Sequence, residues 1–238
     1  TLEQCARCAV PNASFTNTEF SINNAVGLEL KNGAAAKFNT CVFDSNGSYA
    51  CQLGGQGTNG TFTSCTFNKH SSAAVVCDNK AIALFIQTFF SNNGPCHVEV
   101  RDESKGRFEQ CVTDSTAGGI GLFCHNRGTI EIEKSSLKNE QKTALYVGNK
   151  GVALIYDSEI LGCGTCGVFT DLQSTTIIMR NKITRNGHAG ILAEGGEVKI
   201  EQNEIECQEF GIYSTTMAQV VQGNNKFRQN AKADTQIA

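Results

Sequence analysis

One apolar position recurs about every 23 residues from one end of the 238-residue chain to the other. All but one of the residues in this anchor column are apolar: Phe20, Phe43, Phe67, Phe90, Thr113, Leu137, Ile160, Ile183, Ile205 and Phe227. A second apolar column lies five residues before the anchor, from Phe15 to Ile200, and a third lies seven to nine residues after it, from Leu28 to Ile212. Three columns that keep register over nine repeats indicate a solenoid, in which each repeat packs on the next.

The spacing within each repeat is that of β-strands. Residues 144–147 and 190–193 alternate with a period of two, and polar runs such as residues 44–47 mark turns. Leucine-rich repeats have a similar period, but their Leu-x-x-Leu-x-Leu pattern is absent. The sequence therefore predicts an all-β fold, a single-stranded right-handed parallel β-helix of about ten rungs with about 23 residues per rung. We expect the coil to be right-handed because connections between parallel strands are almost always right-handed.

The extent of the repeat divides the chain into three segments. We expect residues 1–10 to be an N-terminal cap or lead-in, residues 11–230 to be the β-helix, and residues 231–238 to be a C-terminal tail or the start of further chain. The chain begins with Thr and no signal peptide leads it, so a processed protein or an excised domain is expected.

Two polar columns accompany the anchor. Three residues after it stand Asn23, Asn46, Asn93, Asn186 and Asn230. Two residues before it stand Cys41, Cys65 and Cys111, and then Asn181, Asn203 and Asn225. We interpret both columns as structural, with side chains that bond to the neighbouring rungs.

The twelve cysteines bear on the cellular compartment. Cys5 with Cys8 and Cys163 with Cys166 are the only C-x-x-C pairs, and they lie too far apart along the solenoid to share one zinc ion. Free thiols, and hence an intracellular (cytoplasmic) location, are favoured because most cysteines fall at inward or turn positions. A disulfide between stacked cysteines is the alternative, and glycosylation sequons at residues 12, 46 and 59 also point away from the cytoplasm.

The charge pattern argues against two classes of partner. The formal net charge is −3, whereas a nucleic-acid binder is usually basic. Arg180, Lys182, Arg185 and Lys199 form a local basic group, which we interpret as a solvated face because it lacks interleaved aromatic residues. No apolar stretch is long enough to span a membrane. We therefore expect neither a nucleic-acid nor a membrane partner.

The last repeats carry a recognisable phrase. Residues 180–191 read Arg-Asn-Lys-Ile-Thr-Arg-Asn-Gly-His-Ala-Gly-Ile, and residues 202–205 and 210–213 read Gln-Asn-Glu-Ile and Phe-Gly-Ile-Tyr. Over about residues 151–230, this phrasing resembles the NosD and CASH-type β-helix repeats of carbohydrate-active enzymes and eukaryotic interaction proteins. Similar repeats form the β-helix domains of F-box substrate receptors and the Shc SH2-domain-binding protein. The resemblance implies the fold, and no family catalytic residue carries over because no catalytic motif is matched.

Carboxylates and histidines form no catalytic pattern in the sequence. Pectate-lyase-like enzymes need clustered carboxylates for Ca²⁺, whereas the acidic residues here are scattered over different repeats. The paired Asp residues of polygalacturonase-like enzymes and the G-x-S-x-G elbow are absent, and His188 is interpreted as a turn residue. We predict that the chain is not an enzyme, with no catalytic residue, no metal site and no cofactor.

One outward column is harder to explain as structural. It consists of the residues between the inward positions of the third strand, and its first four members are mostly polar. Its last five members are apolar or aromatic, on adjacent rungs: Phe123, Tyr146, Phe169, Leu192 and Tyr213. A contiguous apolar patch commonly marks an interaction site, and we predict these five residues as the partner-binding surface. The alternatives are that another segment of the parent protein covers the column, or that aromatic residues simply suit strands.

Two classes of function remain open. A non-catalytic protein-interaction or scaffold module, with a protein partner, is favoured by the missing catalytic groups and the outward aromatic residues. The alternative is a carbohydrate-active protein, lyase- or hydrolase-like or glycan-binding, whose aromatic residues contact a polysaccharide. A third possibility is self-assembly through the ends of the solenoid, where open strand edges need caps.

Overall fold

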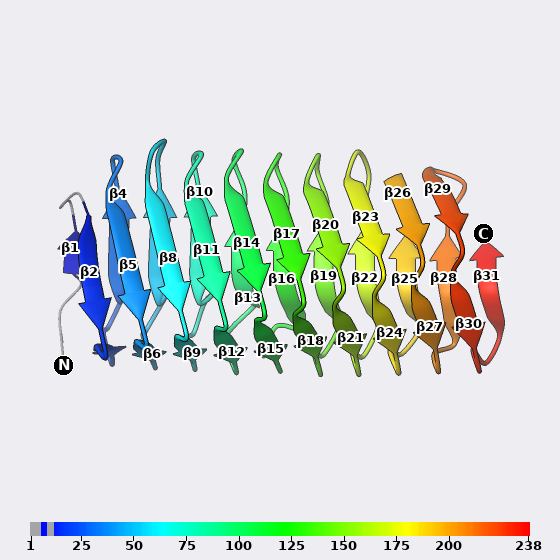
Figure 1. The fold of residues 1–238 in the computed structure, drawn as a ribbon, viewed down its shortest axis with the longest axis horizontal. Coiled ribbons are helices and arrows are strands. Elements are labelled where there is room, and N and C mark those ends of the chain that lie inside the picture. The colour runs from blue at the N-terminus through cyan, green and yellow to red at the C-terminus, as the bar shows by residue number, and fades with distance from the viewer. Residues whose placement is uncertain (1–5, 9–11) are drawn as a thin grey trace.

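The computed structural model describes residues 6–8 and 12–238, and these residues form strands and turns with no helix. The strands are stacked into three parallel sheets along one axis, with β2 and β31 at opposite ends (Figure 1). We name the sheets A, B and C. Each complete rung contributes one strand to each sheet, in that order along the chain. All-β parallel architecture with about ten rungs is therefore confirmed.

Sheet A contains β1 (Ala6–Cys8), β4 (Leu28–Lys31), β7 (Cys51–Gly54), β10 (Val75–Asp78), β13 (Cys96–Val100), β16 (Ile120–Cys124), β19 (Thr143–Val147), β22 (Cys166–Thr170), β25 (Ala189–Ala193), β28 (Phe210–Ser214) and β31 (Ala233–Ile237). Sheet B contains β2 (Ala13–Thr16), β5 (Ala35–Asn39), β8 (Asn59–Thr63), β11 (Ile82–Ile86), β14 (Lys105–Glu109), β17 (Thr129–Glu133), β20 (Val152–Tyr156), β23 (Thr175–Met179), β26 (Gly196–Glu201) and β29 (Ala218–Gly223). Sheet C contains β3 (Glu19–Ser21), β6 (Val42–Asp44), β9 (Thr66–Asn68), β12 (Phe89–Ser91), β15 (Val112–Asp114), β18 (Ser136–Lys138), β21 (Glu159–Leu161), β24 (Lys182–Thr184), β27 (Glu204–Glu206) and β30 (Lys226–Arg228).

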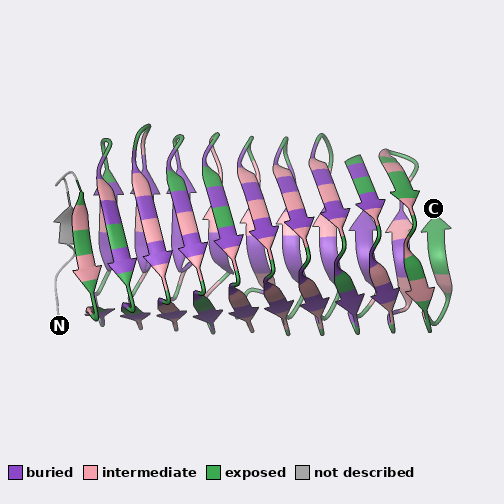
Figure 2. Ribbon diagram, viewed as in Figure 1, coloured by how far each residue is buried: buried purple, intermediate pink, exposed green. Residues whose placement is uncertain are grey.

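Equivalent residues of neighbouring rungs stack directly on one another. Phe20 pairs with Phe43 in sheet C, and Tyr146 pairs with Phe169 in sheet A. Along most strands of sheet B, buried and more exposed residues alternate, as the bands of colour in Figure 2 show. The anchor column thus lies in sheet C, the second column in sheet B and the third in sheet A.

The two ends of the chain extend the same pattern. Residues 1–5, 9 and 10 of the expected cap lie outside the described residues, whereas Ala6–Cys8 form β1 and pair with β4. In the expected tail, Ala233–Ile237 form β31 and pair with β28. The repeat therefore continues into the segment that we expected to be a tail.

Phenylalanine rings fill the interior of the first rungs. Rings of one column stack along the axis, at 4.5 Å between Phe43 and Phe67 and 5.1 Å between Phe62 and Phe85. Rings of the two columns meet edge to face, 5.4 Å apart for Phe62 and Phe67. Burial of each ring contributes about 1.5–3 kcal/mol, and each stacked pair adds about 0.5–1.5 kcal/mol. Between Phe108 and Phe227 the core contains no aromatic ring and is built from Leu, Ile, Val, Ala and Cys, and partly buried Phe227 packs against its C-terminal end.

The turn between sheets C and A is held by a column of polar side chains, which we name the turn ladder. Its members are Asn23, Asn46, His70, Asn93, Thr116, Glu140, Cys163, Asn186, Gln208 and Asn230. Asn46 Oδ1 accepts the N–H of Asn23 at 3.1 Å, while its Nδ2 donates to the carbonyl of Phe20 at 3.1 Å. The ladder thus satisfies backbone groups that strands leave unpaired at a turn, and the structural interpretation is confirmed for this column.

His70 reproduces the hydrogen bonds of an Asn with its ring. Its Nδ1 accepts the N–H of Asn46 at 3.2 Å, which leaves the proton on Nε2 to be donated to the carbonyl of Phe43 at 3.2 Å. Burial lowers the pKa of His70 to about 4, against the smaller opposing effects of the Phe43 carbonyl and the Asp44 charge. His70 is therefore a neutral ring in the ladder at neutral pH.

The bend between sheets B and C carries a second column, the bend ladder, in which three chemical groups do the same task. Seven of its side chains donate to a backbone carbonyl of the preceding rung: Cys41, Cys65, Thr88, Cys111, Asn181, Asn203 and Asn225. The hydroxyls of Ser135 and Ser158 donate instead to the carbonyl two residues earlier in their own rung. The thiol of Cys65 donates to Phe38 at 3.6 Å, the hydroxyl of Thr88 to Phe62 at 3.1 Å, and the amide of Asn203 to Ile178 at 2.8 Å. The structural interpretation of this column is also confirmed.

The cysteines serve as buried donors and apolar fillers. All ten whose side chains are described are free thiols, and nine of these are buried, Cys207 being exposed. Burial raises the pKa of Cys65 to about 12 and that of Cys111 to about 11. These thiols therefore stay protonated and keep their hydrogen bonds to the backbone.

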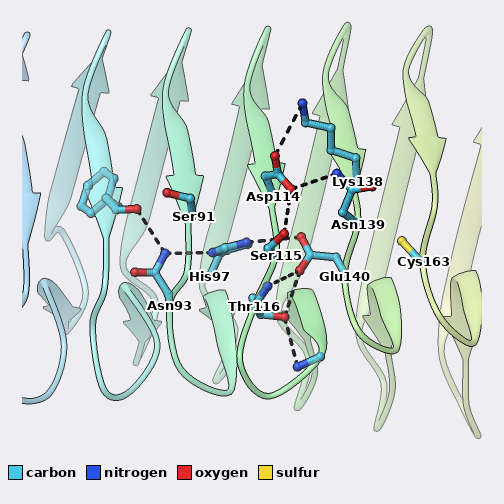
Figure 3. Close-up of polar contacts among 12 residues, drawn as sticks. Ser91, Asn93, His97, Asp114, Ser115, Thr116, Lys138, Asn139, Glu140 and Cys163 are labelled. Carbon is cyan, nitrogen blue, oxygen red and sulfur yellow. Dashed lines mark hydrogen bonds and ion pairs between the residues drawn. The ribbon is translucent and has the colours of Figure 1, made fainter.

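A buried polar cluster marks the seam where the interior changes from aromatic to aliphatic (Figure 3). Its centre is His97, in a column where the adjacent rungs carry Ala74 and Gly121. The amide nitrogen of Asn93 donates to the carbonyl of Phe67 at 3.2 Å and also lies 2.8 Å from His97 Nδ1. Since Nδ1 faces a donor, it must be the acceptor, which leaves the ring proton on Nε2.

Glu140 completes the cluster and meets only donors. Its Oε1 lies 3.2 Å from His97 Nε2, outside hydrogen-bond geometry, and its Oε2 accepts the N–H of Thr116 at 2.8 Å and its hydroxyl at 2.9 Å. The side chains of His97 and Glu140 are both fully buried. Because the N–H and hydroxyl of Thr116 and the Nε2 proton of His97 all point at residue 140, this position needs a hydrogen-bond acceptor.

Candidate functional site on the outer face of sheet A

The outer face of sheet A is organised by two stacked columns. The outer column is the one with the predicted partner-binding residues, and the pairing of the strands places its members on successive rungs. The rim column lies two residues further on, and hence on the same side of the sheet. Its members are Lys31, Gly54, Asp78, Arg101, His125, Gly148, Asp171, Glu194 and Thr215.

Three predicted residues form a ladder of half-buried rings. The rings of Phe123 and Tyr146 are stacked at 5.0 Å with 9° between their planes, and those of Tyr146 and Phe169 lie 4.8 Å apart at 44°. Phe123 also stacks on His125 at 4.2 Å. Because the rings turn their faces to one another, they offer mainly their edges to a ligand, as an apolar floor.

The other two predicted residues belong to a separate apolar cluster. Leu192 is only 9% exposed and packs with buried Cys166 and Ala189, against half-buried Phe169 and Tyr213. Sequence reasoning missed Phe210 and His188 here. The Phe210 ring lies 5.2 Å from the rings of both Tyr213 and His188. His188 lies in a bend, and its Nδ1 is 2.6 Å from Glu209 Oε2.

A charged network adjoins the N-terminal end of the ring ladder. Arg101 Nη1 donates to Glu99 Oε1 at 2.9 Å, and Nη2 lies 3.5 Å from Asp78 Oδ2. Glu99 Oε1 also lies 2.9 Å from His125 Nε2. Gln52 donates to Asp78 at 3.3 Å. Four neighbouring rungs therefore supply one continuous network.

The network fixes the charge of its members. Burial acts to raise the pKa of Glu99, but hydrogen bonds from His125 and Arg101 and the charges of both residues lower it below its ordinary value. Burial acts to lower the pKa of Arg101, and Glu99, Asp78 and Asp102 raise it. Glu99 is therefore a carboxylate and Arg101 a cation across the physiological range.

The imidazole of His125 has the geometry of a proton-transfer group. Its Nε2 is held by Glu99, and its side chain is 22% exposed. No contact to its Nδ1 is formed by the described residues, so this nitrogen remains available to a ligand. An imidazole oriented by a carboxylate is the usual arrangement of a general base.

Tyr146 is held differently, at the other side of Phe123. Its hydroxyl donates to Asp171 Oδ2 at 3.0 Å, and burial together with Asp171 raises its pKa to about 12. A Cβ at Gly148 would lie 3.4 Å from this hydroxyl, which is an ordinary van der Waals contact, so the bond does not depend on a glycine there. Tyr146 is thus a neutral donor positioned by Asp171, and its proton is hard to remove.

The rim column explains why sequence reasoning missed this network. The sequence was tested for a column made of carboxylates alone, whereas this network combines Asp78, Arg101 and His125, which lie about 23 residues apart and meet through stacking. A column taken two residues after the predicted stripe would have found them. No group of three or more His, Cys, Asp or Glu in residues 6–8 and 12–238 is arranged to hold a metal ion.

The chain belongs to the family of proteins with a right-handed β-helix region, whose model matches residues 4–131 and 112–237. The predicted right-handed parallel β-helix is thereby confirmed, whereas the NosD and CASH-type assignment is not. No curated protein matches the sequence. Within the described residues, no helix is long and apolar enough to cross a membrane.

Solved structures of similar fold include carbohydrate-active proteins. The A-module of Azotobacter vinelandii mannuronan C-5 epimerase AlgE4 is 10% identical, with a TM-score of 0.59 over 95% of this chain and 88% of that chain. The periplasmic alginate epimerase AlgG is 9% identical, with a TM-score of 0.46 over 98% and 78%. PfbA, a surface adhesin of Streptococcus pneumoniae, is 9% identical, with a TM-score of 0.40 over 94% and 85%. At these identities the likeness shows the fold alone.

The prediction that the chain is not an enzyme is contradicted by these comparisons. The architecture that matches 95% of this chain is that of an epimerase, so the fold and the absence of pectate-lyase and polygalacturonase motifs do not exclude catalysis. The prediction was wrong because it tested the motifs of a few enzyme classes, whereas a site on a solenoid is assembled across rungs.

Proposed function

We propose that the chain is a carbohydrate-active protein that holds a glycan on the outer face of sheet A, with His125 as the proton-transfer group of its reaction. The observation that carries the proposal is the continuity of the ring ladder with the His125–Glu99–Arg101 network. The rings supply an apolar floor for sugar C–H groups, and the network supplies donors and acceptors for hydroxyls.

Within this proposal the residues have separate tasks. His125 exchanges a proton through Nδ1, Glu99 holds its ring, and Arg101 keeps Glu99 charged. Tyr146 contacts the sugar and is oriented by Asp171. The five residues that we predicted as a partner-binding surface become the floor of the glycan site and its C-terminal continuation.

The test uses the whole chain and a panel of oligosaccharides, with binding measured by calorimetry and products identified by mass spectrometry and NMR. We expect Tyr146→Ala to lose binding and His125→Gln to keep binding while product formation falls at least a hundredfold. Tyr156→Ala is the matched control, because Tyr156 is a half-buried outward tyrosine of sheet B. Binding that survives Tyr146→Ala, or turnover that survives His125→Gln, would overturn the proposal.

A protein partner is the second candidate, favoured by the apolar cluster of Leu192, Phe210 and Tyr213. Such a partner would cover the C-terminal rungs, where the ring ladder ends. Loss of a captured protein in Tyr213→Ala, with glycan binding absent in the unmodified chain, would favour this function. An intracellular location remains a prediction.

A further inference from the structure

The outer face of sheet A holds more carboxylates than cations. Among the residues whose side chains the structure describes, the outer and rim columns together carry the carboxylates of Glu29, Asp78, Glu99, Asp171 and Glu194, and the permanent cations of Lys31 and Arg101. Lys31 is ion-paired with Glu29, and Arg101 is hydrogen-bonded to Glu99. The two columns therefore present a net negative face with each of these cations already neutralised.

Arg101 is the cation nearest the proposed site, and it is the least available. Its guanidinium lies 2.9 Å from Glu99 Oε1, 3.5 Å from Asp78 Oδ2 and 3.6 Å from Asp102 Oδ2. A uronate carboxylate that approached Arg101 would lie beside these three carboxylates. Like charges at such distances disfavour binding, and more strongly where the face is partly desolvated.

An uncharged sugar meets the same face favourably. Its hydroxyls can donate to the carboxylates, since Asp171 uses Oδ2 for Tyr146 and Oδ1 for the N–H of Leu172 and each carboxylate oxygen has a second lone pair. Its C–H groups can lie on the ring edges of Phe123, Tyr146 and Phe169. Neither contact requires a free cation.

We infer, on the basis of the proposed function, that the glycan of this site is uncharged and that polyuronates are excluded. This specificity differs from that of the epimerase with the same architecture, whose name identifies mannuronan, a polymer of acidic sugars. This difference in glycan specificity arises from the negative charge of the outer face of sheet A, and the shared fold does not determine it.

The decisive experiment compares two forms of one polymer. Oligomannuronate and oligogalacturonate are each tested before and after chemical reduction of the carboxyl groups to hydroxymethyl groups, which keeps the backbone and linkage. We expect the reduced form to bind the whole chain at least tenfold more tightly than the parent. Raising the salt concentration to about 0.5 M should narrow the difference, because salt screens the repulsion.

Charge-removing variants locate the effect. Glu194→Gln should raise the affinity for the oligouronate by a larger factor than it changes the affinity for the reduced form, and Glu131→Gln on sheet B should change neither. Tighter binding of the oligouronate that is lost in Phe169→Ala would overturn the inference while leaving the proposed site standing. Absence of binding by the parent oligouronates, by their reduced forms and by a panel of uncharged oligosaccharides would overturn the proposed function itself.

Discussion

Aromatic residues change sides between the two halves of the solenoid. From Phe15 to Phe108 the rings fill the interior, and the outer column is mostly polar. From Phe123 to Tyr213 the interior is aliphatic, and the rings stand outside. The C-terminal rungs show that the coil needs no interior ring. The outward rings therefore need an explanation other than core packing, and the charged network lies where the two halves meet.

The largest expected effect on stability comes from removing an interior ring, and it tests directly whether interior and outer rings have different tasks. Phe67→Ala removes a fully buried ring that stacks on two neighbours, and we expect it to lower the free energy of unfolding by about 3–5 kcal/mol. Phe169→Ala removes a half-buried outer ring and should cost about 1–2 kcal/mol. Urea unfolding of both variants measures the difference. Equal losses would mean that the outer rings are part of the structural core.

The second prediction concerns pH and the N-terminal half, where His70 stands in the turn ladder. Because its folded pKa of about 4 lies below its ordinary value of 6.5, its contribution to stability is complete above pH 6.5 and is lost as the pH falls toward 4. The shift corresponds to about 3 kcal/mol between pH 7 and pH 4.

The matched variant is His70→Asn, which restores the usual ladder residue. It should keep the hydrogen bonds to Asn46 and Phe43 and remove this part of the pH dependence. Thermal unfolding between pH 4 and pH 7 measures both proteins. The same slope in the two would show that other groups cause the acid sensitivity.

The third prediction tests the seam between the halves. Glu140→Gln keeps the shape of the side chain, but its amide can satisfy the N–H of Thr116 only by turning its own donor toward His97 Nε2. Moving the ring proton to Nδ1 would instead oppose the amide of Asn93. We expect the free energy of unfolding in urea to fall by about 1–3 kcal/mol. Glu131→Gln is the control, at a half-buried outward position of sheet B. A stabilised variant would mean that the buried charge costs more than its hydrogen bonds contribute.

The smallest expected effect on stability concerns Cys65 of the bend ladder, in the N-terminal half. Cys65→Ala removes the thiol donor to the carbonyl of Phe38 and should cost about 1 kcal/mol. Cys65→Ser should stay within about 0.5 kcal/mol of the unmodified protein, since the hydroxyl of Thr88 does this task one rung later. Differential scanning calorimetry resolves the two. A serine variant as unstable as the alanine variant would mean that the thiol acts through packing.

The fold could be predicted because the same apolar positions recur in every rung of the sequence. Each buried residue of the anchor column is aligned with its equivalent on the next rung, so one period in the sequence records both the strand and its partner. The ladders were visible for the same reason. His70 and Glu140 were missed as ladder members because their side chains differ from Asn while their hydrogen bonds do not.

The candidate site could be predicted only in part. Phe123, Tyr146 and Phe169 were identified from their outward position, which alternation fixes. The hydrogen bond from Tyr146 to Asp171 was not, because it crosses to another rung and depends on the direction of both side chains. Chemistry between rungs depends on side-chain direction, which a period alone does not record.

The bend ladder has a consequence for how far sequences can drift on this architecture. A thiol, a hydroxyl and an amide all satisfy the same backbone carbonyls, so the position selects a hydrogen-bond donor rather than one residue type. Substitutions among Cys, Ser, Thr and Asn can then accumulate without loss of the coil. Two chains can keep one architecture at 10% identity, as this chain and the AlgE4 module do.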